Sequence, residues 1–88
     1  MKFEGAVIKE QGITFVIVIV AKHTVDNPGE ADRAIASFEA FFPGNPIILM
    51  AQDETGRPFY YGRQDIADFM TNVPLKNIPW KEYTIKRD

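Results

Sequence analysis

The sequence predicts one small α+β domain, in which two helices pack on a mixed sheet of five strands. Five short runs rich in β-branched and aromatic residues favour strands. Two further segments repeat apolar residues at the three- to four-residue spacing of an amphipathic helix. The chain has 88 residues, 45% of them hydrophobic, which suits a single globular domain over residues 1–88 and leaves no room for a second core.

Residues 2–9 and 13–22 are predicted to form a β-hairpin around a short turn at residues 9–12. The second of these strands is apolar on both faces. One face carries Ile13, Phe15, Ile17, Ile19 and Ala21, and the opposite face carries Val16, Val18 and Val20. A strand with one face in water would alternate apolar and polar residues, so we expect both faces to be covered.

A helix is predicted over residues 28–42. Asn27 is a suitable N-cap, Pro28 suits the first helical position, and Glu30 lies three residues after the cap. Pro43 and Gly44 end the helix. Its buried stripe is expected to contain Ala31, Ala34, Ile35, Phe38, Phe41 and Phe42.

The remaining strands are predicted at residues 46–52, 58–61 and 80–85. The first of them is apolar on both faces and pairs back with the second across a turn at residues 53–56. The last has a lower apolar content than the central strands and is expected at an edge. A second helix, over residues 63–72, is expected to bury Ile66, Phe69, Met70 and Val73.

The resulting order is ββαββαβ, expected as a two-layer sandwich. After the first strand this is the connection order of the ferredoxin-like fold, of which the chain would be a variant. The short hairpin turn conflicts with that fold, because it places the first strand beside a strand whose two neighbours are already assigned. Either the last strand moves elsewhere, or the two middle strands pair in parallel through a right-handed crossover.

The placement of the helices decides whether the domain needs a partner. If both helices cover the same face, Val16, Val18 and Val20 remain exposed. Burying one such side chain is worth roughly 1.5–3 kcal/mol, so a symmetric homodimer through this sheet face would follow. If one helix covers each face, no partner is required.

A candidate ligand site lies where two strands lead into helices. If those strands run parallel, both helix N-termini open at one edge of the sheet and could hold a small anion, with the histidine available for acid–base work. These residue types are also typical of positions where a strand ends and a helix begins, so they can be explained without a ligand. The candidate residues are Lys22, His23, Thr24, Tyr61, Gly62 and Arg63.

Composition excludes several kinds of chemistry. The sequence has no cysteine and one histidine, which removes thiolate nucleophiles, cysteine-bound zinc and any site with two imidazoles. The nucleophile-elbow and phosphate-loop motifs are also absent. We therefore assign no catalytic residue, no metal and no cofactor.

Charge and hydropathy narrow the partners further. A net charge of −2 argues against broad electrostatic binding of nucleic acid. The longest apolar run, residues 15–21, is far shorter than the roughly 20 residues that a membrane-spanning helix needs. The sequence favours a cytoplasmic, non-enzymatic interaction module that binds a second copy or another protein. A domain that binds a small molecule or anion at the His23/Arg63 edge is the alternative.

Overall fold

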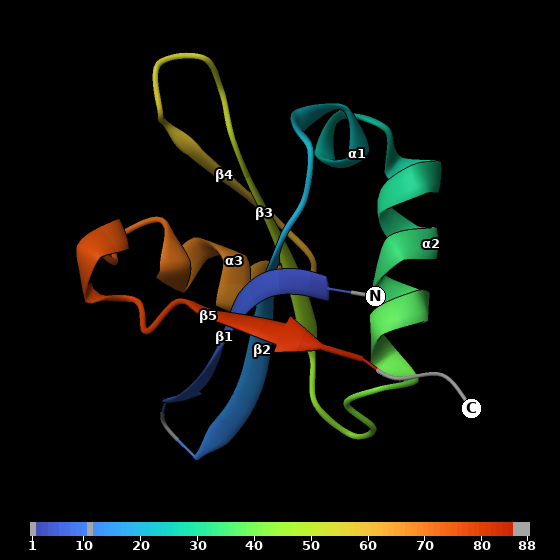
Figure 1. The fold of residues 1–88 in the computed structure, drawn as a ribbon. Helices are drawn as coiled ribbons and strands as arrows, with labels where there is room; N and C mark the ends of the chain where they lie inside the picture. The colour runs from blue at the N-terminus through green and yellow to red at the C-terminus, as the bar shows by residue number, and fades with distance from the viewer. Residues whose placement is uncertain (1, 11, 86–88) are drawn as a thin grey trace.

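The computed structural model of the chain describes residues 2–10 and 12–85, which form a five-stranded sheet with helices packed on it (Figure 1). The predicted element order and the mixed sheet are confirmed. The strands are β1 (Lys2–Glu10), β2 (Ile13–Ile19), β3 (Ile47–Gln52), β4 (Pro58–Tyr61) and β5 (Lys81–Thr84). The helices are α1 (Lys22–Asp26), α2 (Pro28–Glu39), α3 (Gln64–Met70) and the short 3₁₀ helix η1 (Leu75–Asn77).

The strand order is β4-β3-β2-β1-β5, which resolves the conflict left open by the sequence. The hairpin pairs β1 with β2 antiparallel, and β5 pairs antiparallel with the other side of β1, at the edge where it was expected. The middle strands β2 and β3 pair in parallel, and β4 returns antiparallel to β3. Both alternatives are therefore realised together.

The two main helices lie on opposite faces of the sheet, so the domain has three layers rather than the expected two (Figure 1). Helix α2 packs on the face that carries Val16 and Val18, and α3 packs on the face that carries Phe15 and Ile17. Strands β2 and β3 are apolar on both faces, and each face is closed by its own helix.

The expected homodimer surface is consequently covered within the chain. Val16 and Val18 are both 0% exposed beneath α2, and Val20 is partly buried against the same cluster. The prediction that these three valines remain open to a partner is corrected by this arrangement. The reason is that α2 lies across the valine face while α3 crosses the other one.

Two element boundaries differ most from the expectation, by three residues each. The strand predicted to reach residue 22 ends at Ile19, and the following residues turn into α1 before Asn27 starts α2. The Asn27 side chain accepts a hydrogen bond from the Glu30 backbone N–H at 3.2 Å, as expected of an N-cap. Helix α2 ends at Glu39, short of the predicted residue 42, and the chain turns there as Phe42 N–H bonds to Phe38 O and Glu39 O.

Strand β1 lies very close to β2 at Gly5. A Cβ atom at this position would collide with the backbone oxygen of Ile17 on the neighbouring strand. Gly5 is also the last β1 residue that pairs with β5, opposite Lys81. The glycine therefore permits a close strand contact at the point where β1 leaves its outer neighbour.

Replacing Gly5 by alanine should destabilise the domain, because the added methyl group meets backbone that cannot rotate away. We expect a loss of about 1–3 kcal/mol in the free energy of unfolding, measured by urea titration. Gly29→Ala in α2 is the matched control, since its Cβ would find nothing nearer than 3.4 Å and alanine favours helix. Equal stability of Gly5→Ala and the wild type would contradict this account.

Candidate functional site

The predicted anion site is not assembled, because its two halves leave the sheet in opposite directions. Strand β3 runs parallel to β2 and antiparallel to β4, so β4 is antiparallel to β2. The prediction required the opposite. After β2 the chain enters α1, where the Lys22 ammonium lies 4.6 Å from the centre of the Phe59 ring. After β4 the chain passes Gly62, which lies against Ile47 and Ile48 at the start of β3.

The basic side chains of the candidate site are also engaged with nearby acids. Lys22 pairs with Asp26 at 2.5 Å, and His23 Nδ1 lies 3.2 Å from a Glu30 carboxylate oxygen. Lys22, His23 and Thr24 all lie within the five residues of α1 rather than in a loop. The two basic side chains of α1 therefore contact acids of α1 and α2. The described residues of α1 present no converging set of donors for an anion.

Tyr61, Gly62 and Arg63 line a groove of about 320 Å³ beside α2. The Tyr61 hydroxyl donates a hydrogen bond to Asp32 at 3.0 Å, and this bond raises the pKa of Tyr61. Arg63 Nε donates to Asp65 at 2.8 Å. Asp32 and Glu39 also line the groove, so its carboxylates outnumber its one cation, which is itself paired. The groove therefore disfavours an anion.

Gly62 is required by packing in this groove. Its φ of +149° is one that other residues rarely adopt, and a Cβ there would lie 2.9 Å from the Ile47 backbone oxygen. From its place between a strand and a helix, Gly62 was predicted to bind a ligand. The structure gives it a role in bringing the chain close to β3.

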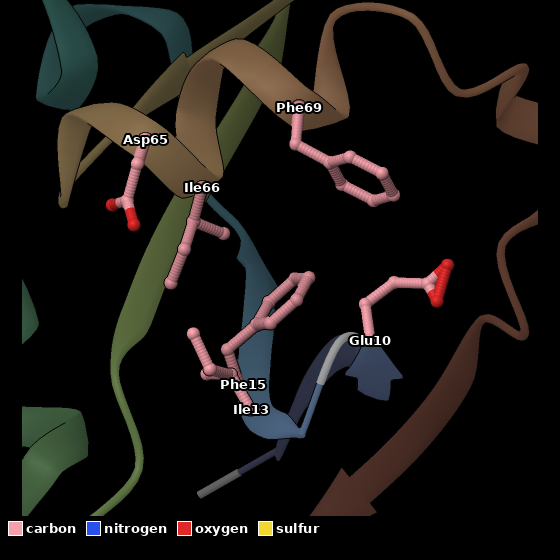
Figure 2. Close-up of a pocket in the computed structure, with 6 residues that line it drawn as sticks. All are labelled: Glu10, Ile13, Phe15, Asp65, Ile66 and Phe69. Atoms are coloured by element: carbon pink, nitrogen blue, oxygen red, sulfur yellow. The ribbon is translucent and has the colours of Figure 1, made fainter.

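A second groove, which the sequence analysis did not find, lies between the β1–β2 hairpin and α3. It consists of two hollows, of about 110 and 310 Å³, and both are lined by Phe69 and Glu10. We call it the Phe69 groove. Figure 2 shows the smaller hollow, where Phe69 and Ile66 extend from α3 towards the hairpin. The larger hollow is lined by Ile8, Met70, Val73 and Ile78 among others.

Both large apolar residues that are exposed among the described residues border this groove. Val7 is 43% exposed and Phe69 is 37% exposed, and both line the larger hollow. The Val7 side chain lies on the α2 face of β1, opposite the face that carries Ile8 and Phe69. Phe69 was predicted to be buried, because it shares the apolar stripe of Ile66 and Met70. That expectation is wrong, since α3 places Phe69 over the hairpin end where little covers it. Local periodicity carries no signal for this difference.

The charged residues that line the Phe69 groove are Glu10 and Asp65 at the smaller hollow and Lys9 and Glu10 at the larger one. Glu10 lies on the side of Phe69 (Figure 2). The hydrogen bond from Arg63 lowers the pKa of Asp65, so this group is a carboxylate at neutral pH. Glu10 has no ion pair among the described residues. An apolar surface with an unpaired acid at its edge suits an apolar ligand that carries a basic group.

The adjacent tyrosines of β4 have opposite surroundings. Tyr61 is hydrogen-bonded, whereas the Tyr60 hydroxyl is buried and has no hydrogen-bond partner in the described part of the chain. Burial raises the pKa of Tyr60. An unsatisfied buried hydroxyl costs free energy that the phenylalanine analogue would not incur.

No family model, curated protein or solved structure matched this chain when it was compared with all three. Within residues 2–10 and 12–85, no three His, Asp or Glu side chains are grouped as metal ligands. The helices of the same residues include none with the length and apolar content to cross a membrane. We therefore infer function from the surfaces of the chain itself.

The two tyrosines give a paired prediction of opposite sign. Tyr60→Phe should raise the free energy of unfolding by about 1 kcal/mol, because it removes an unsatisfied hydroxyl. Tyr61→Phe should lower the melting temperature, because it removes the bond to Asp32. Thermal unfolding followed by circular dichroism measures both.

The effect of Tyr61 should also depend on pH. Its pKa in the folded protein is raised, so its contribution to stability is present below its ordinary pKa of 10.0 and is lost as the pH rises through the raised value. The difference between wild type and Tyr61→Phe should therefore shrink in alkali. A difference that stays constant to high pH would contradict the assignment.

Proposed function

We propose that this domain is a non-enzymatic interaction module that binds a polypeptide partner in the Phe69 groove. The observation that carries the proposal is the exposure of Phe69, whose ring lines both hollows. Contiguous exposed apolar surface with a polar rim is typical of interaction sites. Aromatic side chains are also over-represented at such surfaces.

The energetics favour an apolar occupant, and the shape of the groove favours an elongated one. Fully burying a phenylalanine is worth roughly 1.5–3 kcal/mol, and a partner that covers the exposed part of Phe69 would gain a share of this. The larger hollow, of about 310 Å³, is lined by four consecutive residues of β1, Val7 to Glu10, so it runs beside that strand. An open groove beside a strand suits an elongated ligand better than a compact one.

The acid that lines both hollows supports the choice of partner. Glu10 lines both hollows and has no described ion-pair partner, so a lysine or arginine on the partner would complement it. At the rim such a pair mainly affects the rate of association and the choice of partner. The proposed partner is therefore an apolar polypeptide segment with an adjacent basic residue.

The homodimer that the sequence favoured is not proposed through the sheet face, because α2 covers Val16 and Val18. A second copy is instead one of the occupants that the experiments below distinguish. The cytoplasmic location expected from the composition stays a prediction.

Small-molecule binding in the groove of Tyr61, Gly62 and Arg63 is the second candidate. A volume of about 320 Å³ supports it, and the lining acids Asp32 and Glu39 favour a cationic compound over the anion first expected. The Tyr61 hydroxyl is already committed to Asp32, which leaves few polar groups to orient a ligand.

Selection of a phage-displayed random peptide library on the purified domain tests the leading proposal. Enriched peptides, synthesised and titrated by calorimetry, should lose about ten-fold or more in affinity when Phe69 becomes alanine, as expected of a central aromatic contact. Ile35→Ala is the control, because Ile35 lines the other groove.

The opposite outcomes are equally clear. A library that enriches no peptide, or peptides that bind Phe69→Ala as tightly as the wild type, would contradict the proposed site. Loss of binding in Ile35→Ala alone would transfer the function to the groove beside α2. A thermal melt of each variant separates loss of binding from loss of folding.

A further inference from the structure

We propose that the polypeptide in the Phe69 groove is extended and adds a strand to the open edge of β1. This inference rests on the proposed function and specifies its mode of recognition. Strand addition supplies main-chain hydrogen bonds for affinity, and the hollows beside the strand select alternate side chains.

The outer edge of β1 is only partly occupied. Strand β1 extends from Lys2 to Glu10, but its pairing with β5 ends at Gly5 opposite Lys81. Its other edge is paired with β2 as far as Glu10 opposite Ile13. Among the described residues, no strand lies on the outer side of residues 6–10.

The hydrogen-bonding direction along β1 follows from its neighbours. The Val16 N–H bonds to Pro46 O at 2.9 Å, so Val16 directs its backbone groups towards β3 and away from β1. Val7 is opposite Val16 in the antiparallel hairpin and therefore belongs to a non-hydrogen-bonded pair. The N–H and C=O of Val7, and of Lys9 two residues later, consequently point to the open edge.

This open edge borders the larger hollow of the Phe69 groove. Val7, Ile8, Lys9 and Glu10 all line that hollow together with Phe69. A strand added here would direct alternate side chains to the face of Ile8 and Phe69, where the apolar lining lies. The remaining side chains would point to the face of Val7.

The other free edges of the sheet are less suitable. Strand β5 presents the exposed charges of Lys81 and Glu82 and has four residues. Strand β4 also has four residues, begins with Pro58 and is followed by the tight approach of Gly62. Charges, proline and short length are devices that protect an edge from further pairing. The segment of β1 beyond Gly5 also ends in two charges, Lys9 and Glu10, but it carries no proline and adjoins an apolar hollow.

These features define the partner as an extended segment with apolar residues at alternate positions and a basic residue in line with them, next to Glu10. A suitable probe is the capped heptapeptide Lys-Thr-Val-Thr-Val-Thr-Lys. Its valines share one face and are flanked by lysines at both ends, so either strand direction places a lysine near Glu10.

Two single N-methylations of this peptide test the mode of binding on the wild-type protein. Adjacent residues of a strand direct their N–H groups to opposite edges, so methylation of the central Thr and of the following Val block opposite edges. Only one of the two should weaken binding, by about ten-fold, in titrations followed by amide chemical shifts. Equal binding of both methylated peptides would overturn strand addition.

Lys9→Pro provides the matching change on the protein, because proline removes an N–H that faces outwards and is tolerated at an unpaired edge. It should weaken the heptapeptide by about ten-fold, whereas Lys9→Ala, which keeps the N–H, should not. If the heptapeptide fails to bind while library-selected peptides bind through Phe69, strand addition is overturned and the groove stands. Failure of both overturns the proposed function as well.

Sedimentation velocity completes the test. The domain should be monomeric at the protein concentrations used for titration. A dimer that Lys9→Pro dissociates would show that a second copy of the chain occupies the edge, and this would overturn the assignment to a separate polypeptide.

Discussion

The two-sided apolar character of β2 and β3 is the constraint on which the rest of the structure depends. Val16, Ile17 and Val18 are consecutive in β2, alternate between the two faces, and are all 0% exposed. Each would forfeit roughly 1.5–3 kcal/mol if left in water, so neither face of the central pair can remain open. The domain therefore needs a covering layer on both sides of a sheet built from only 88 residues.

The chain supplies the two layers unequally. Strands β2 and β3 are parallel, so their connection crosses one face and carries the 12-residue helix α2 over the valines. Strands β4 and β5 lie at opposite edges, so the segment between them must cross the whole of the other face. It does so with α3, whose seven residues span only about 10 Å, and with η1. The shorter cover leaves the hairpin end thinly packed, and the Phe69 groove results.

Edge geometry and core geometry are connected through β1. This strand is long enough to pair with β2 along the whole hairpin, but β5 accompanies it only as far as Gly5. Beyond that point the chain that precedes β5 lies on the α3 face. There Ile78 is only 5% exposed and belongs to the core. The same burial that completes the core thus keeps β5 from extending along β1. A hollow and an unpaired edge arise together for one physical reason.

The anion site was predicted from local sequence patterns, and these patterns do not specify the relative direction of β2 and β4. The turn at residues 53–56 indicates that β4 returns antiparallel to β3, and this is observed. Once β2 and β3 pair in parallel, β4 must oppose β2, so Lys22 and Arg63 leave the sheet in opposite directions. Each strand-to-helix transition was recognisable from its residues, but their meeting required a strand direction that the rest of the sheet excludes. Ion pairs of Lys22 with Asp26 and of Arg63 with Asp65 then follow locally.

The amino-acid sequence by itself determined the five strands, the two main helices and their order, the hairpin, the edge position of β5 and the need to cover both faces of β2. These follow from periodicity, turn residues and apolar content over a few neighbouring positions, whereas α1 and η1 were not predicted. Only the tertiary structure decided that the helices take opposite faces, that Val16 and Val18 are inside, and that Phe69 is outside. Those outcomes depend on which strands become neighbours and how far each crossing segment reaches. Residues distant in the chain set these quantities jointly, and no single stretch of sequence contains them.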